Sequence, residues 1–301
     1  MLDVIDSARL GELVTIADAI AALRQAVVSG RSTGATARTA TSVRMGHLLL
    51  MPAEDQELVG VKITGVAPAN PSLGLPRITG TYLLHDAATL QPLAAIDGAA
   101  LTLLRTAALS ALAVEELAVP DASRLLIFGT GPQAEAHIRA LSTVRKLHDV
   151  AVSGRTPDGT AAFVRRGIDG VTLRPAVDTD VRSADLIVCC TSSAAPLFDG
   201  SRPAAHATVV AMGSHTQDAR ELDTQILRRS TVVVEDRETA LREAADVSSA
   251  VAAKELADVI ALADLVAGTK VDQDRPRVFR SVGMAWEDLA VAGKVLDKTP
   301  H

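Results

Sequence analysis

The chain has 301 residues, of which 48% are hydrophobic and 22% charged, so it is long enough for one large or two ordinary domains with real cores. Lys and Arg total 30 against 36 Asp and Glu, and the net charge of -6 argues against a nucleic-acid binder, which usually carries a basic surplus. Aromatic residues make up only 2%, so a surface that stacks bases is not expected.

Targeting and redox signals favour a cytoplasmic protein without a membrane partner. The N-terminal sequence MLDVIDSARL lacks the apolar core of a signal peptide, and no run approaches the roughly 18 uncharged apolar residues of a membrane span. The only cysteines, Cys189 and Cys190, are adjacent in a predicted strand. Neighbouring strand residues point to opposite faces, which disfavours a disulfide and fits a reducing compartment.

The first part of the chain predicts a helix, a set of strands and a second helix. Ile16, Ile20, Leu23 and Val27 recur at helical spacing, and residues 101–117, rich in Ala and Leu, predict a buried helix. Several short strands in succession, separated by Pro and Gly, predict a mostly antiparallel sheet. The strand candidates are residues 36–44, 47–53, 58–64, 78–85 and 93–96.

From about residue 120 the pattern changes, because apolar strands now alternate with helical stretches. Near-continuous Val, Ile and Leu runs are typical of parallel strands that are buried on both faces. The alternation predicts a Rossmann-like, doubly wound α/β domain over residues 120–280. Residues 281–295 predict a helix, and we expect residues 281–301 to join residues 1–119 in an α+β domain. The strand candidates are residues 125–128, 150–153, 186–190, 208–212 and 231–234.

The strongest local motif is a glycine-rich turn between a strand and a helix. After Phe128 the chain reads Gly129-Thr130-Gly131-Pro132-Gln133-Ala134, a G-x-G-x-x-A pattern. The first glycine permits the tight turn, the second leaves room for a pyrophosphate, and the alanine allows the helix to pack closely on the strand. The alternative is a plain strand–turn–helix connection, but the flanking pattern favours dinucleotide binding.

The end of the next strand favours NADP(H), with NAD(H) as the alternative. An NAD site usually has Asp or Glu at this strand end to bind the ribose 2′-hydroxyl. Here the strand ends in Ser153, Gly154, Arg155 and Thr156, and Asp149 stands at its start. Arg155 can pair with a 2′-phosphate, with Ser153 and Thr156 as donors, or it can be an ordinary loop arginine.

Three basic residues in apolar surroundings are candidate site residues. Lys62, within a strand candidate, either faces solvent or serves a site in which burial makes it useful for proton transfer. Arg105 is the only charged residue between Asp97 and Glu115, and it needs an anion: a ligand, or an internal carboxylate such as Asp97. Arg44 lies at a strand end, and its position alone favours a side chain that faces solvent.

His215 follows the carboxyl end of a predicted parallel strand, the edge where ligands gather in such folds. A histidine there can exchange protons near neutral pH, and the alternative is a polar loop residue. The histidines are scattered and show no metal-binding spacing, so no metal site is predicted.

Taken together, these motifs resemble those of the ornithine cyclodeaminase/μ-crystallin family. The likeness follows the family order over nearly the whole chain. The matching segments are Gly60-Val61-Lys62, Pro68-Ala69-Asn70-Pro71, Gly74-Leu75-Pro76, Gly80, Asp97-Gly98, Leu101-Thr102, Arg105-Thr106-Ala107-Ala108, Ser110-Ala111-Leu112-Ala113, Gly129-x-Gly131-x-Gln133 and Ser281-Val282-Gly283-Met284-Ala285.

The resemblance implies a substrate and dimerisation domain, built from both chain ends, beside the Rossmann-like domain. It implies a homodimer that oxidises amino acids or reduces imines with a nicotinamide cofactor. Arg44 and Lys62 would contact the substrate carboxylate region, and Arg105 would lie where substrate and cofactor meet. Val282 would border the substrate. The remaining cofactor residues implied by the resemblance are Thr191, Ala211, Met212, Gly213 and Ser281.

Two departures from the family pattern bear on activity. Cyclodeaminases carry an aspartate two residues after the glycine that corresponds to Gly213, and here that position is His215. Arg77 replaces an expected small hydroxyl residue and is either a further phosphate contact or surface. We therefore expect an imine reductase or amino-acid dehydrogenase in which Lys62 or His215 handles the proton. The alternatives are an ornithine cyclodeaminase and a non-catalytic NADPH-dependent binding protein.

Overall fold

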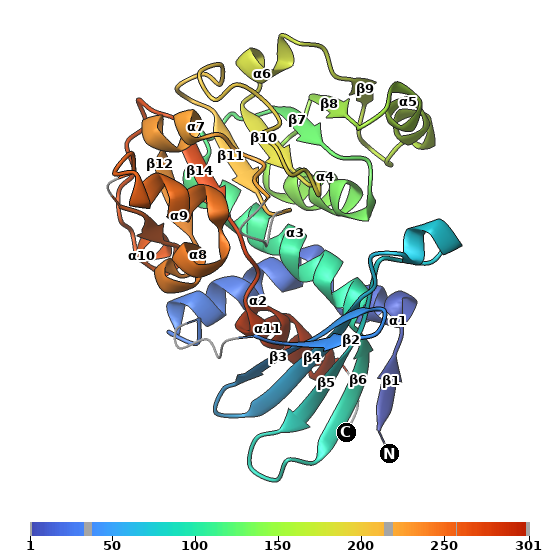
Figure 1. Ribbon diagram of the computed structural model, residues 1–301. Helices are drawn as coiled ribbons and strands as arrows, with labels where there is room; N and C mark the ends of the chain where they lie inside the picture. The colour runs from blue at the N-terminus through green and yellow to red at the C-terminus, as the bar shows by residue number, and fades with distance from the viewer. Residues whose placement is uncertain (1, 33–37, 214–218, 257, 299–301) are drawn as a thin grey trace. The chain divides into compact units, whose positions relative to one another are not determined.

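The computed structural model describes residues 2–32, 38–213, 219–256 and 258–298 (Figure 1). The chain divides into two compact units. Unit 1 comprises Met1–Leu109 and Met284–His301, and unit 2 comprises Ser110–Gly283. The functional domain boundaries proposed from the sequence, at 119/120 and 280/281, stay a prediction.

Unit 1 is built on a six-stranded mixed sheet in the order β1-β6-β5-β4-β3-β2. Only β1 and β6 pair in parallel, and the other neighbours are antiparallel, as the run of short strands predicts. Side chains alternate between the two faces, so Met51, Lys62 and Tyr82, which are register partners on adjacent strands, share one face. The strands are β1 (Asp3–Ile5), β2 (Thr39–Val43), β3 (Gly46–Glu54), β4 (Leu58–Val66), β5 (Ile78–Asp86) and β6 (Pro92–Asp97).

The helices of unit 1 cover that face of the sheet. The last helix, α11 (Ala285–Leu296), packs against α2 (Ile16–Val28) and against β3 and β4. A capping box formed by Thr15 and Asp18 begins α2, and the apolar periodicity of residues 16–27 predicts this helix correctly. The remaining elements of unit 1 are α1 (Ser7–Leu13) and a short 3-10 helix (Asn70–Leu73).

The helix α3 (Gly98–Leu117) begins in unit 1, and Asp97 accepts the backbone N–H groups of Ala99 and Ala100 at its start. By length and mean hydropathy it also passes a test for a membrane span that tolerates two charged residues, whereas the sequence expectation concerned uncharged runs. However, 67% of its most apolar window is buried inside the protein, and it carries Arg105. A buried core helix passes the same test, so this is weak evidence for a membrane.

Unit 2 contains an eight-stranded, all-parallel sheet in the order β13-β12-β14-β11-β10-β7-β8-β9 (Figure 1). The α/β fold class predicted from the sequence is confirmed. The strands are β7 (Arg124–Phe128), β8 (Asp149–Ser153), β9 (Leu173–Pro175), β10 (Leu186–Cys189), β11 (Thr208–Ala211), β12 (Thr231–Val234), β13 (Ile260–Ala261) and β14 (Arg277–Arg280). The helices are α4 (Pro132–Val144), α5 (Pro157–Arg166), α6 (Asp180–Ser183), α7 (Thr224–Arg229), α8 (Arg237–Glu243), α9 (Ala245–Ala252) and α10 (Leu262–Val266).

The strand β14, between β11 and β12, is absent from the sequence-based expectations. Arginines at both of its ends hide its apolar pattern, yet both are fully buried. Arg280 pairs with the buried Asp246 through Nε at 2.9 Å, and Arg277 donates to backbone carbonyls, including that of Leu117 at 3.1 Å. The predicted helix over residues 281–295 is therefore wrong at its start, because α11 begins only at Ala285.

Candidate active site

A cleft of about 630 Å³ lies at the carboxyl ends of the strands of unit 2. The glycine-rich turn after β7 forms one side and the end of β8 another. Seven residues predicted for cofactor binding line it together: Gly129, Thr130, Gly131, Ser153, Arg155, Thr156 and Thr191. Cys190, Ser192 and Ser193 also line it and were not predicted. This is the edge of a doubly wound sheet where ligands bind.

The two glycines of the turn fit a dinucleotide for different reasons. Gly129 has a φ of +121°, and a Cβ there would lie 2.6 Å from the carbonyl oxygen of Cys190, so a side chain is excluded by the fold itself. Gly131, the N-cap of α4, has open space where a Cβ would stand and makes no side-chain cap. Gly131 lines the cleft, and α4 begins directly after it at Pro132, whose missing N–H costs nothing at this position. A helix start beside an open cleft suits a pyrophosphate.

The end of β8 carries no carboxylate, as the sequence predicts. Asp149 stands at the start of the strand, where it pairs with Arg174 at 2.7 Å. Arg155 is exposed and lines the cleft. Thr156 uses its hydroxyl to accept the N–H of Gly159 at the start of α5, so its side chain is held in place while its own O–H stays available as a donor.

Glu221 is a buried carboxylate that the sequence did not single out. It accepts the backbone N–H and hydroxyl of Thr191 at 2.8 and 2.7 Å, and the backbone N–H groups of Met212 and Gly213 at 3.2 and 2.7 Å. It therefore ties the ends of β10 and β11 together. Burial raises the pKa of Glu221, and these hydrogen bonds oppose the rise.

Ser281 and Val282 are held in the same manner by Glu235, at the end of β12. The carboxylate accepts the Ser281 hydroxyl at 2.6 Å and the backbone N–H groups of Val282 and Gly283, each at 2.9 Å. Ser281 also donates its backbone N–H to Ala211 at 2.9 Å. Glu235 therefore fixes the segment in which two predicted site residues lie, although neither lines the described cleft.

In unit 1, Lys62 lies in a buried cluster of charges. It projects from β4 on the helix-covered face, is only 3% exposed, and its Nζ lies 2.7 Å from Asp288 Oδ2 of α11. Thr102 of α3 accepts a hydrogen bond from Nζ at 3.3 Å. Burial lowers the pKa of Lys62, and the Asp288 charge opposes that shift. The solvent-facing alternative for Lys62 is therefore wrong.

Arg105 belongs to the same cluster. It is 6% exposed, its Nη1 pairs with Glu287, and its Nε lies 3.3 Å from Asp288 Oδ1. The internal carboxylates that Arg105 needs are thus on α11, and Asp97 instead caps α3. No sequence spacing links Arg105 to Glu287, because they lie 182 positions apart.

The other predicted residues are more exposed or fall outside the described chain. Arg44 lies in the tight turn between β2 and β3, and Arg77 precedes β5; both side chains are exposed in unit 1. His215 lies outside the described residues. Within the described residues, no group of three or more His, Cys, Asp or Glu side chains is arranged to hold a metal ion.

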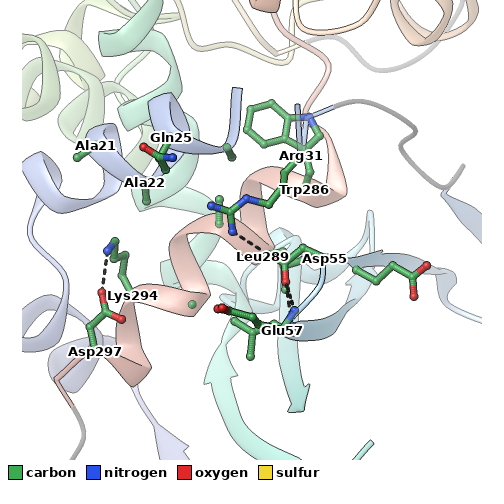
Figure 2. Close-up of a pocket in the computed structure, with 15 residues that line it drawn as sticks. Ala21, Ala22, Gln25, Arg31, Asp55, Glu57, Trp286, Leu289, Lys294 and Asp297 are labelled. Atoms are coloured by element: carbon green, nitrogen blue, oxygen red, sulfur yellow. Dashed lines mark hydrogen bonds and ion pairs between the residues drawn. The ribbon is translucent and has the colours of Figure 1, made fainter. Parts of the chain in front are cut away.

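A second cavity, of about 420 Å³, lies in unit 1 among α2, α11 and the β3–β4 turn (Figure 2). Its two basic side chains are already paired, Arg31 with Asp55 at 3.0 Å and Lys294 with Asp297 at 2.7 Å. None of the predicted site residues is among those that line it.

Comparison with known proteins identifies the family. The model of the ornithine cyclodeaminase/mu-crystallin family matches residues 3–301. A Delta(1)-pyrroline-2-carboxylate reductase of Colwellia psychrerythraea is 33% identical over 264 residues, which cover 83% of each chain. Among solved structures, Thermococcus litoralis Delta(1)-pyrroline-2-carboxylate reductase in complex with NADH and L-proline superimposes with a TM-score of 0.90, at 28% identity and over 99% of this chain and 97% of the other. An archaeal alanine dehydrogenase dimer with bound NAD gives a TM-score of 0.89, at 25% identity and over 98% and 95%. The chain belongs to the ornithine cyclodeaminase/mu-crystallin family.

Proposed function

We propose that the protein is an NAD(P)H-dependent imine reductase that acts on a cyclic imino acid of the Δ1-pyrroline-2-carboxylate type. The observation that carries this proposal is the full-length likeness to a reductase that holds both NADH and L-proline. The comparisons bear out the imine reductase expected from the sequence. Such an enzyme would work in the cytoplasm, where the free thiols Cys189 and Cys190 stay reduced.

The cleft of unit 2 would hold the cofactor, with the pyrophosphate at Gly131 and the first amides of α4. When bound, the reduced nicotinamide supplies the hydride. Ser281 and Val282, held by Glu235, would border the nicotinamide and the substrate.

Unit 1 would supply the groups that bind and protonate the substrate. Arg105, with Arg44, orients the substrate carboxylate, because a guanidinium can bind it through two hydrogen bonds. Lys62 Nζ donates a proton to the imine nitrogen, and burial that lowers its pKa makes it a better acid for that transfer. His215 is the alternative proton donor.

A substrate screen tests the reaction. The substrates are cyclic imino acids, and 2-oxo acids with ammonia or methylamine. Each is incubated with NADPH and, separately, with NADH, and oxidation of the reduced cofactor is followed in every combination. We expect oxidation of the cofactor with a cyclic imino acid and formation of the matching amino acid. Ammonia release from ornithine without net reduced cofactor would indicate a cyclodeaminase, and tight NADPH binding without turnover would indicate a binding protein.

We propose a preference for NADP(H) over NAD(H), supported by Arg155 at the cleft and by the missing carboxylate after β8. Arg155→Ala should raise the KM for NADPH by about 10–100-fold, since hydrogen bonds to a charged group contribute about 1.5–3 kcal/mol. The KM for NADH should change little. Arg165→Ala, which removes an exposed arginine further along α5, is the control. Equal losses for both cofactors, or none, would count against the preference.

We also propose a homodimer joined through the outer face of the unit 1 sheet, the face opposite Lys62. Apolar side chains continue across it from strand to strand: Leu50 pairs with Ile63, Val61 with Leu83, and Leu83 with Ala95. Leu48 is 40% exposed, Leu50 38% and Val4 75%. An exposed apolar patch of this kind marks an interaction surface, and the archaeal relative is described as a dimer.

A charge in this face should separate the two copies. Leu50→Lys places an ammonium in each half of an isologous apolar interface, where burial of the charge is costly. We expect the mass measured by light scattering to fall from that of a dimer to that of a monomer at micromolar concentration. Val177→Lys, which alters an exposed apolar residue in unit 2, should leave the mass unchanged. A monomeric wild-type protein would refute the proposal.

A further inference from the structure

Four charged side chains that are buried in the described part of unit 1 lie together. Lys62 on β4 and Arg105 on α3 supply two positive charges, and Glu287 and Asp288, consecutive on α11, supply two negative charges. Both carboxylates are fully buried. Because the four charges balance, the cluster can stay ionised away from water before any substrate arrives.

The two carboxylates have different tasks. Glu287 pairs with Arg105 and also accepts the backbone N–H of Met284 at 2.6 Å, so it caps the helix that carries it. Asp288 makes the ion pair with Lys62 at 2.7 Å, and its other oxygen lies 3.3 Å from Arg105 Nε. Asp288 therefore lies between the two cations that the proposed reaction uses.

The Lys62 ammonium keeps one N–H donor without an assigned partner among the described residues. An ammonium has three N–H donors, and within the part of the chain that the structure describes Nζ is assigned two partners, Asp288 and Thr102. The Asp288 ion pair and the Thr102 hydrogen bond hold the ammonium in place. In the proposed reaction, the remaining N–H is the one that donates to the substrate nitrogen.

The groups packed around Lys62 either favour or disfavour its charged ammonium form. From α11, Asp288 and Glu287 favour the ammonium, whereas Arg105 of α3 and burial itself disfavour it. Tyr82, its register partner on β5, stays protonated because burial raises the pKa of the phenol well above its usual value. Its other register partner, Met51 of β3, carries no charge.

We propose that Asp288 is a positioning residue that keeps the Lys62 ammonium charged and aimed, and that this pair determines how far into alkaline solution the enzyme stays active. The proposal rests on the imine reduction proposed above, in which Lys62 must be protonated to act as the acid. Activity is then lost as the pH rises through the pKa of Lys62. Removing the Asp288 charge lowers that pKa, so the loss must begin at lower pH.

The test is the pH profile of kcat/KM for reduction of the cyclic imino acid. Asp288→Asn keeps the side-chain shape but removes the charge, and should move the alkaline limb down by about 1–3 units, the effect of one close opposite charge. Asp288→Glu keeps the charge but displaces it, so the limb should remain near that of the wild type while kcat falls. Glu287→Gln, the matched control on the same turn of α11, should act on KM through Arg105 more than on the limb.

A second measurement does not depend on turnover. Protein labelled with ¹³C at lysine Cε reports the titration of Lys62 directly, and the missing signal in Lys62→Met assigns the resonance. A lower Lys62 pKa in Asp288→Asn without reduction of any imine supports the pairing and rejects the proposed function. If Asp288→Asn reduces the imine, and neither the alkaline limb of its pH profile nor the pKa of Lys62 differs from the wild type, the role of Asp288 is overturned. If Asp288→Asn does not fold, wild-type kcat in Asp288→Glu is the contradicting result.

Discussion

Replacing Lys62 by alanine should lower kcat for reduction of a cyclic imino acid by about 10²–10⁴-fold, the contribution of one positioned proton donor. The Nζ atom is the group removed, and the hydroxyl of Thr102, which accepts a hydrogen bond from it, already donates its own proton to the carbonyl oxygen of Gly98. The cleft that we propose for the cofactor is lined, among the described residues, by residues of unit 2, so NADPH binding, followed by fluorescence, should remain near that of the wild type.

The substitution also leaves Asp288 without its lysine. Removal of one partner from a buried pair costs about 3–5 kcal/mol in general, although Arg105 remains close to Asp288 here. Thermal unfolding must therefore be measured beside the rates, and Lys62→Met, which keeps the volume, is the better-packed companion. Small primary amines added to Lys62→Ala should restore part of kcat, which a merely structural lysine would not allow. A wild-type rate in this variant would remove Lys62 from the mechanism and leave His215 as the candidate.

The fold was predictable where one local pattern determines each element. Near-continuous apolar runs such as Leu125–Phe128 can form only buried strands or short helix segments, and their regular alternation with helices decided between the two. The pattern failed at β14, where Arg277 and Arg280 interrupt the apolar run. Their burial depends on Asp246 and on distant backbone carbonyls, and no local pattern reveals those partners.

The candidate site divides along the same line. The glycine turn and Arg155 are local signals, because a strand, a turn and a helix bring those residues to one cleft within a single stretch of sequence. The cluster around Lys62 is not a local signal, because β4, α3 and α11 come together only in the folded unit. In the sequence, Glu287 and Asp288 look like ordinary acidic residues of an amphipathic helix. Glu221 and Glu235 were missed for the same reason, since their partners are mainly backbone N–H groups on other strand ends.

Gly131→Asp should abolish cofactor binding while leaving the fold intact. A Cβ at this position meets nothing within 4 Å, and aspartate is a better N-cap than glycine, so the temperature of unfolding should stay equal or rise slightly. The carboxylate would occupy the place of the pyrophosphate at the start of α4. Juxtaposed like charges cost several kcal/mol, so the Kd for NADPH should rise by more than about 100-fold.

Two further glycine variants separate binding from folding. Gly131→Ser caps the helix without adding charge, so its loss of affinity should be much smaller than that of Gly131→Asp. Gly129→Ala places a Cβ 2.6 Å from the Cys190 carbonyl oxygen at a φ of +121°, so here unfolding should move to lower temperature. Calorimetry of NADPH binding and thermal unfolding on the three variants distinguishes the two effects. Wild-type affinity in Gly131→Asp would mean that the phosphates bind elsewhere, because no dinucleotide can share that position with a carboxylate.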